Sequence, residues 1–362
     1  MAHPMSKTDK DHSAALQAQV EQAVSNKEKL NITGNGSKSF LGVVNEAPTV
    51  KVSEHSGIIS YEPTELVITA RAGTTLKEIN NALKECKQTL AFEPPSFGDN
   101  ATLGGTIACA LSGPAKPYLG GTRDYILGCK VLTGRGQILQ FGGEVMKNVA
   151  GYDVSRLMTG AMGTLGVLLD ISIKVLPATP HQVTLSRETT VEDAIESMQS
   201  LAGLGLPVTA SAYEDGKQLM RIAGTETAVN ASAEKLAGDK EENDEYWQQL
   251  REHKLPFFSN TKPLWRLSVP VLTPPIDIEG EWLYDWAGTQ RWLFTDAPPD
   301  LVRSACAAIG GHATIFRAGE AIKRSAGVFQ PLPAALLTLH QNLKQEFDPD
   351  SLFNHQRLFP EF

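Results

Sequence analysis

Glycines accompanied by hydroxyl and basic side chains are the residues of this sequence best suited to bind a phosphate-containing ligand. The first group is Gly34, Asn35, Gly36, Ser37 and Lys38. Because glycine lacks a Cβ, its backbone N–H groups can approach a diphosphate closely, while Ser37 and Lys38 add further donors. The third glycine of a G-x-G-x-x-G motif is replaced by Ser39, which disfavours a nicotinamide-type Rossmann site. Taken alone, a plain turn explains this loop as well as a phosphate site does.

A second group of small and polar residues lies in loops between short strands further along the chain. Its members are Pro95, Thr102, Gly104, Gly105, Ala108, Ser112, Gly113, Arg123, Asp124, Gly163, Thr164, Gly166 and Val167. Glycine turns between strands are ordinary in β-rich domains. That explanation leaves out Arg123-Asp124 and the pair of small-residue loops around the Pro-Pro turn at 94–98. A long cofactor running between two half-domains accounts for them.

Regular elements must hold these loops in place. Apolar patterning predicts strands at 30–33, 66–72, 126–133, 137–141 and 167–175, and helices at 12–27, after Thr75 and at 334–347. Thr75 and Glu78 can form a capping box at the start of their helix. Alternation of apolar and polar residues at 167–175 predicts a half-buried strand. Residues 102–108 are interpreted as a small-residue turn.

A second pattern of strands and helices begins after Pro177 and Pro180. It comprises a helix near 191–198, a hairpin around Asp215-Gly216, a helix after Thr225, strand-like runs at 264–270 and 282–294, and a helix at 300–309. Such a mixture predicts an α+β sandwich. The helix expected at 334–347 has Leu336, Leu339, Leu343 and Phe347 on one apolar stripe.

Length, charge and cysteine usage bound the class of protein. At roughly 150 residues per domain, 362 residues predict two domains. The net charge of −8 disfavours binding to nucleic acid or to an anionic membrane. The four cysteines are scattered, without a C-x-x-C pair or a Cys/His cluster, so neither a metal site nor an iron–sulfur cluster held by this chain alone is expected. A polar N-terminus and the lack of a long apolar run predict a cytoplasmic protein.

Several segments together carry a family resemblance. They are residues 33–37 (TGNGS), 101–105 (ATLGG), 120–124 (GGTRD), 142–153 (GGEVMKNVAGYD) and 163–167 (GTLGV), with further similarity at 61–66, 141–158, 247–252 and 311–314. The sequence resembles the vanillyl-alcohol-oxidase/PCMH flavoprotein family, and within it the smaller FAD-binding subunits of bacterial glycolate oxidases. The similarity runs from about residue 14 to the C-terminus.

This resemblance implies an α+β fold with a PCMH-type FAD-binding domain of two α+β subdomains at 1–178, a reduced α+β cap at 179–320, and a C-terminal segment, 321–362, that returns to the FAD domain. Residues 34–38 would hold the FAD pyrophosphate, 102–113 would line the flavin and ribityl region, and Gly163–Val167 would meet FAD through backbone groups. Positions 33–39 contain neither His nor Cys, so FAD is expected to be non-covalent, and Cys109 is expected to be a small buried residue. The family's tail pattern N-P-G-[KR] is here Asn354-His355-Gln356-Arg357.

The implied activity is oxidation of glycolate to glyoxylate, with electrons passed to an acceptor other than NAD. The implied partners are a larger FAD subunit and an iron–sulfur subunit, and membrane contact would be peripheral, at the inner face of the cytoplasmic membrane, or through a partner. The alternatives are a flavin-carrying relay or scaffold subunit, or a stand-alone FAD dehydrogenase of another 2-hydroxy acid. Such chemistry needs a carboxylate clamp and a base, for which Arg317 and His312 are candidates, while Lys147 could approach the flavin ring. Structural roles for His312 and Lys147 remain open.

Overall fold

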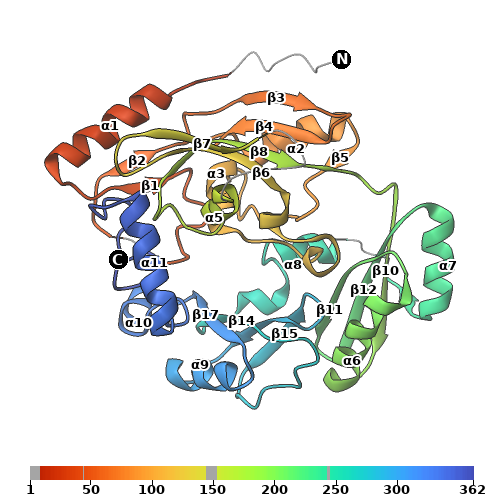
Figure 1. Ribbon diagram of the computed structural model, residues 1–362. Coiled ribbons are helices and arrows are strands. Elements are labelled where there is room, and N and C mark those ends of the chain that lie inside the picture. Colours follow the sequence, from red (N-terminus) through yellow and green to blue (C-terminus); the bar gives the residue numbers. More distant parts are fainter. Residues whose placement is uncertain (1–8, 44, 144–152, 243–244) are drawn as a thin grey trace. The chain divides into compact units, whose positions relative to one another are not determined.

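The computed structural model describes residues 9–43, 45–143, 153–242 and 245–362, and these form two compact units. The first unit comprises Met1–Leu111, Gly121–Pro177 and Pro331–Phe362, and the second comprises Ser112–Gly120 and Ala178–Gln330. These units do not follow the bounds expected from sequence at residues 112–120, at Ala178 and at residues 321–330, which belong to the second unit. Figure 1 traces both units along the chain.

The first unit is built on a five-stranded antiparallel sheet in the order β3-β4-β8-β6-β7. Its strands are β3 (Ile58–Glu62), β4 (Val67–Arg71), β8 (Val167–Lys174), β6 (Ile126–Leu132) and β7 (Ile138–Gly142). The alternation in β8 predicted one solvent-facing side, but β8 is the central strand and Ser172 is buried. The hydroxyl of Ser172 is satisfied there by Thr69 Oγ1, 2.9 Å away.

Smaller elements surround this sheet. They are α1 (Ser13–Asn26), the parallel pair β1 (Asn31–Thr33) and β2 (Thr49–Lys51), α2 (Leu76–Glu85), the pair β5 (Gln88–Thr89) and β9 (Leu176–Pro177), α3 (Leu103–Cys109), η1 (Thr122–Tyr125), α5 (Val154–Met158) and α11 (Ala334–Phe347). The expected cap of α2 is confirmed in part, because Thr75 Oγ1 accepts a hydrogen bond from the N–H of Glu78. Apolar side chains of α1, α2, α3 and the sheet form one core.

The segment interpreted as a small-residue turn is helix α3. Thr102 caps it, since its Oγ1 accepts a hydrogen bond from the N–H of Gly105. A Cβ at Gly104 would lie 2.7 Å from the Cβ of Ala72, so the glycine allows α3 to pack directly against the end of β4. Low intrinsic helix propensity is therefore outweighed by a cap and by close packing.

Helix α11 contacts the main core of the first unit through its C-terminal half. Leu343 and Phe347 contact the core, and the Phe347 ring centroid lies 6.4 Å from that of Phe141. Leu336 and Leu339 of the same apolar stripe are 46% and 56% exposed, so the stripe is only partly covered. The helix makes contacts where its C-terminal end meets the sheet, and helical spacing alone does not reveal where contacts stop.

The second unit contains an eight-stranded antiparallel sheet in the order β13-β10-β12-β11-β15-β16-β14-β17. Its strands are β10 (His181–Glu188), β11 (Val208–Glu214), β12 (Lys217–Gly224), β13 (Asp239–Lys240), β14 (Leu264–Ser268), β15 (Glu281–Asp285), β16 (Gln290–Phe294) and β17 (His312–Arg317). Its helices are α4 (Lys116–Leu119), α6 (Val191–Leu201), η2 (Ala202–Leu204), α7 (Glu226–Leu236), α8 (Tyr246–Arg251), η3 (Pro256–Ser259), α9 (Pro299–Ala308) and α10 (Glu320–Ala326).

The helices of this unit form local cores with the strands that they cover. Val302 and Cys306 of α9 pack against Trp265 and Leu267 of β14, and α6 packs against Tyr284 of β15. Since successive side chains of a strand alternate between faces, Arg266 points away from the α9 core. The strand register places Arg266 opposite Trp292 and Thr314. This second face of the sheet carries the basic residues considered below.

Candidate cofactor-binding site

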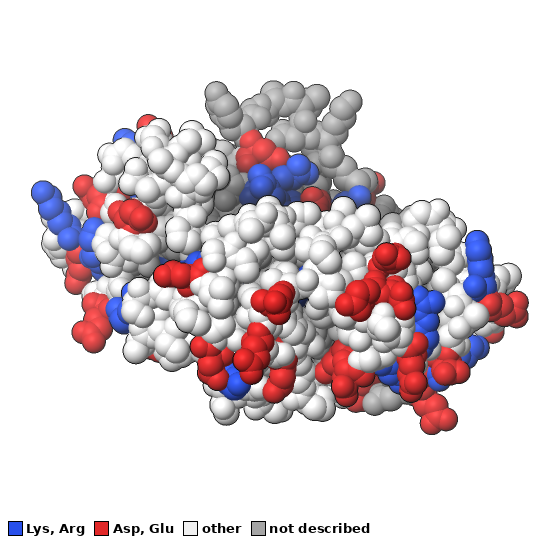
Figure 2. All heavy atoms as spheres, turned by 90° about the horizontal axis from the view of Figure 1, so that it is seen from below, with Lys and Arg blue, Asp and Glu red and all other residues white. Residues whose placement is uncertain are grey.

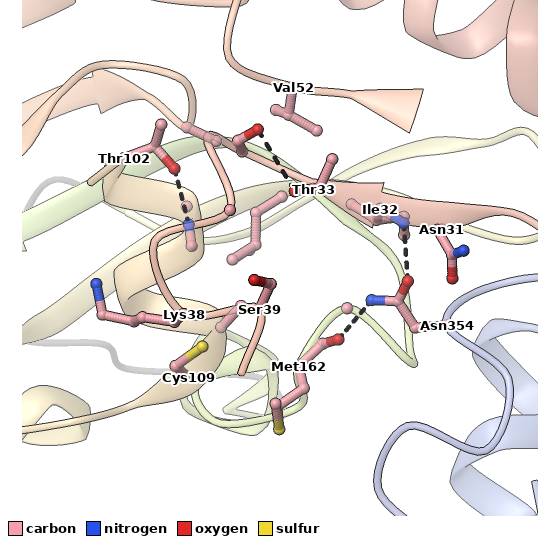
Figure 3. A pocket seen from close by; sticks show the side chains of 18 of the residues that line it. Asn31, Ile32, Thr33, Lys38, Ser39, Val52, Thr102, Cys109, Met162 and Asn354 are labelled. Carbon is pink, nitrogen blue, oxygen red and sulfur yellow. Dashed lines mark hydrogen bonds between the residues drawn. The ribbon is translucent and has the colours of Figure 1, made fainter. Parts of the chain in front are cut away.

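A cavity of about 240 Å³ lies within the first unit. Its walls come from parts of the chain that are far apart in sequence: residues 31–39, Thr49 and Val52, Ala72, helix α3 with Thr102, several residues between 158 and 168, and the C-terminal residues Asn354 and Arg357. Figure 3 shows Lys38 and Cys109 on one side of this space and Asn354 between Ile32 and Met162 on another. Folding thus brings both glycine groups of the sequence to one site.

Most of the cofactor-binding residues predicted from sequence line this cavity. They are Gly34, Asn35, Gly36, Ser37, Lys38, Thr102, Gly104, Gly105, Ala108, Gly163 and Gly166. Two short pairings bring these loops together. Strand β1, which pairs in parallel with β2, leads into the first loop, and Thr102 forms an isolated antiparallel bridge with Thr75, the N-cap of α2. The loop after β1 and the segment that begins at Thr102 therefore start from neighbouring parts of the first unit.

The other predicted cofactor-binding residues that the structure describes do not line this cavity. Asp124 caps η1, where its carboxylate accepts a hydrogen bond from the N–H of Gly121. Thr164 donates its hydroxyl hydrogen to the carbonyl oxygen of Ala161, 2.7 Å away. The remaining residues are Pro95, Arg123, the fully buried Val167 of β8, and the pair Ser112 and Gly113, which belong to the second unit.

The glycines of the first loop serve different purposes. A Cβ at Gly34 would lie 2.2 Å from Thr102 Oγ1, so Gly34 permits the loop to rest against the cap of α3. Gly36 has a φ of +74° and no heavy atom within 4 Å of the position of a Cβ. Positive φ favours glycine, and the open space leaves the backbone at Gly36 accessible to a ligand. This cradle fits a diphosphate group.

The cavity is electrostatically suited to an anion. Burial raises the pKa of the Cys109 thiol, while the nearby charges of Lys38 and Arg357 act to lower it. Two cations from distant segments therefore act on one point of the cavity wall. Lys38 is 6% exposed, and its Nζ lies 3.4 Å from Ser37 Oγ. Figure 2 shows acidic side chains scattered over the face of the molecule that it presents, with basic ones among them, and the chain as a whole carries a net charge of −8.

Several lining residues were not among the predicted site residues. Asn354 and Arg357 stand at the two ends of the altered tail motif, and Cys109 and Met162 lie next to predicted glycine loops. The retained Asn and Arg of that motif were the available signal for the tail. Cys109 was expected to be a plain buried residue, and it contributes its side of α3 to the cavity wall.

The three catalytic candidates are placed differently. Lys147 lies outside the described residues, together with the rest of the 144–152 motif. His312 and Arg317 are the first and last residues of β17 in the second unit. Burial together with the charges of Arg266 and Lys116 lowers the pKa of His312, although its side chain keeps solvent contact. Burial likewise lowers the pKa of Arg317.

A group of basic side chains surrounds one aromatic ring near Arg317. The guanidinium carbons of Arg266 and Arg317 lie 5.9 Å and 5.7 Å from the ring centroid of Phe316, and the ring centroid of His253 lies 5.2 Å from it. Burial lowers the pKa of Arg266 to about 10, and burial with the two arginine charges lowers that of His253 well below its usual range. Among the described residues, no carboxylate forms an ion pair with Arg266.

Comparisons with known proteins agree with this site. The family described as "FAD binding domain" matches residues 11–142. The chain is 46% identical over 351 residues to glycolate oxidase subunit GlcE of Escherichia coli (strain K12). The aligned region covers 97% of this chain and 98% of that protein. It is 30% identical over 164 residues to a D-lactate dehydrogenase of Anaerostipes hadrus, covering 44% of this chain and 34% of that protein.

A solved structure gives the same fold. Alkyldihydroxyacetonephosphate synthase superposes with a TM-score of 0.65 at 13% identity, covering 95% of this chain and 75% of that one. The predicted α+β fold with a PCMH-type FAD-binding domain is thereby confirmed, and fold and cavity together define an FAD-binding flavoprotein. More narrowly, the chain belongs to the family of the FAD-binding glycolate oxidase subunit GlcE. None of the helices within the described residues has the length and apolar character needed to cross a membrane.

Proposed function

We propose that this chain is the FAD-binding subunit of a glycolate oxidase that converts glycolate to glyoxylate and passes the electrons to an acceptor other than NAD. The observation that carries the proposal is the glycine-lined cavity with Lys38 and Arg357, in a chain similar to GlcE along nearly its whole length. The proposed partners are a larger FAD subunit and an iron–sulfur subunit, in the cytoplasm or peripherally at the inner face of the cytoplasmic membrane.

The cofactor would be held by the residues of the first unit. The loop at Gly34–Lys38 would take the diphosphate, and the walls at Thr102–Ala108 and Gly163–Gly166 would take the remainder. When bound, FAD supplies the hydride acceptor for the carbon that carries the hydroxyl group. We propose non-covalent binding, because the loop at 33–39 contains neither His nor Cys.

The substrate would be held by the second unit. Arg266 and Arg317 are proposed to bind the carboxylate of a 2-hydroxy acid, since a bidentate guanidinium–carboxylate pair offsets the cost of burying the cation. His312 has a lowered pKa and is neutral near pH 7, the state in which an imidazole can accept the hydroxyl proton. The role of Lys147 as a group near the flavin remains part of the proposal.

The visible spectrum of the purified chain tests the cofactor. Absorbance of oxidised flavin is expected, and a colourless protein that FAD cannot reconstitute would overturn the proposal. Anaerobic addition of glycolate then tests the chemistry. Bleaching of the isolated subunit places oxidation on this chain, whereas bleaching only after the partner subunits are added identifies an electron relay.

A further inference from the structure

The C-terminal segment Leu352–Arg357 reaches the cavity and joins two of its walls. Asn354 Oδ1 accepts a hydrogen bond of 2.7 Å from the N–H of Ile32 in β1. Its Nδ2 donates a hydrogen bond of 2.6 Å to the carbonyl oxygen of Met162, in the turn before Gly163. Figure 3 shows the amide lying between these two partners. One side chain therefore fixes the spacing between the first glycine loop and the Gly163 turn.

The backbone around Asn354 makes this bridge specific. Its N–H donates to the carbonyl oxygen of Leu30, and the N–H of Leu30 donates to the carbonyl oxygen of Leu352, so the segment runs beside the start of β1. Asn354 has a φ of +42°, a region that asparagine tolerates better than most residues. A Cβ at Gly163 would lie 2.6 Å from Asn354 Nδ2, so the glycine makes room for the amide.

Arg357 follows three residues later and lines the cavity itself. Its Nη2 donates a hydrogen bond of 2.9 Å to the carbonyl oxygen of Leu41, which orients the guanidinium beside the end of the glycine loop. Its charge acts on Cys109 together with that of Lys38. The cavity thus has one cation from the glycine loop and a second from the other end of the chain. A diphosphate carries the complementary charge.

We propose that residues 352–357 form a wall of the FAD site, in which Arg357 binds the diphosphate and Asn354 is a positioning residue for the two glycine loops. This inference rests on the proposed function, because it takes FAD as the ligand. It adds a residue from outside the glycine loops to the set that recognises phosphate.

Flavin binding to the apoprotein tests Arg357. Arg357→Gln is expected to raise the dissociation constant for FAD about tenfold or more, while that for riboflavin, which has no phosphate, stays within about twofold. Arg357→Lys keeps the charge and should recover part of the loss. Arg135→Gln is the matched control, since Arg135 is exposed and contacts only the carbonyl oxygen of Glu346 among the described residues. Equal weakening of both flavins would show a merely structural role and overturn the assignment.

Asn354→Gly tests the positioning role, because glycine accepts the positive φ and removes only the amide bridge. Weaker FAD binding and a changed visible circular dichroism of the bound flavin are expected, with Asn354→Asp intermediate because it retains the acceptor for Ile32. Unchanged binding and spectrum would overturn this role. If the wild-type protein fails to bind FAD, the proposed function is wrong. If the wild-type protein binds FAD and the variants bind it equally well, only the inference about the C-terminal segment is wrong.

Discussion

Lys344 Nζ lies 2.7 Å from Asp348 Oδ2, and the two side chains are 3% and 0% exposed. The ammonium also donates to the carbonyl oxygens of Thr164 and Phe353. The carboxylate accepts hydrogen bonds from the N–H groups of Leu352 and Phe353. This buried pair ends α11 and fixes the chain just before Asn354, so it anchors the segment that reaches the cavity.

Removing one member of this pair is expected to be costly. Asp348→Ala would leave Lys344 buried without its counter-ion and two backbone N–H groups without acceptors, at a cost of about 3–5 kcal/mol in unfolding free energy. Urea denaturation measures the change. Asp350→Ala is the control, because Asp350 is exposed and no contact of its side chain is seen among the described residues. A cost below about 1 kcal/mol for Asp348→Ala would contradict this account.

The two glycines of the first loop should respond differently to alanine. Gly34→Ala places a Cβ against Thr102 Oγ1, which is expected to disturb the cap of α3 and to reduce both thermal stability and FAD content. Gly36→Ala meets open space, so its cost in stability is limited to about 1 kcal/mol from the positive φ. Thermal denaturation of the two apoprotein variants measures the stability that each substitution costs. Equal losses of stability would argue against the packing role of Gly34.

Acid should weaken the first unit through a carboxylate network. Arg71 Nη1 lies 3.1 Å from both Asp170 Oδ1 and Asp11 Oδ2, and the fully buried His55 lies 3.2 Å from Asp170. Partial burial by itself raises the pKa of Asp11, but hydrogen bonds from Ser13 and the charges of Arg71 and His55 lower it to about 2. Burial by itself raises the pKa of Asp170, but the hydrogen bond from His55 and the charge of Arg71 outweigh it, so this pKa is lowered.

Because these folded-state pKa values lie below the unfolded ones, the stabilisation is complete above about pH 5 and is lost as the pH falls toward 2. Asp170→Asn should therefore lower stability at pH 7 and flatten its dependence on pH between about 5 and 2.5. Denaturation at a series of pH values gives this slope, with Asp99→Asn at an exposed position as the control. A slope that is unchanged in Asp170→Asn would exclude the network as a cause of acid sensitivity.

Arg266 should separate stability from activity. Arg266→Met removes a buried cation that has no acidic partner among the described residues, so unfolding free energy is expected to stay equal or rise. The KM for glycolate of the assembled enzyme should rise about tenfold or more if Arg266 binds the carboxylate. FAD content should be unaffected.

Arg303→Met is the matched control in the same unit. The Arg303 guanidinium donates to the carbonyl oxygens of Ala326 and Gly327, so its loss should lower stability and leave KM unchanged. Steady-state kinetics measure the KM for glycolate of the two variants, and urea denaturation measures their unfolding free energy. If Arg266→Met keeps the wild-type KM, the carboxylate is bound elsewhere.

The sequence by itself determined the features that depend on near neighbours. The strands at 126–132 and 138–142, the helix that Thr75 caps, and the two glycine groups follow from alternation, capping and missing side chains, all of which act over a few residues. Family resemblance then supplied the fold and the cofactor, because several such short patterns recur in one order along the chain.

Tertiary structure decided which of these residues meet. Pro95, Arg123 and Asp124 were predicted together with the cavity residues but do not line the cavity. Asn354, from the C-terminal part of the chain, does line it. Burial of Ser172 in β8, exposure of Leu336 in α11 and the helical state of α3 were likewise set by neighbours distant in sequence. A local pattern records what a residue can do, whereas long-range packing decides which partner it has.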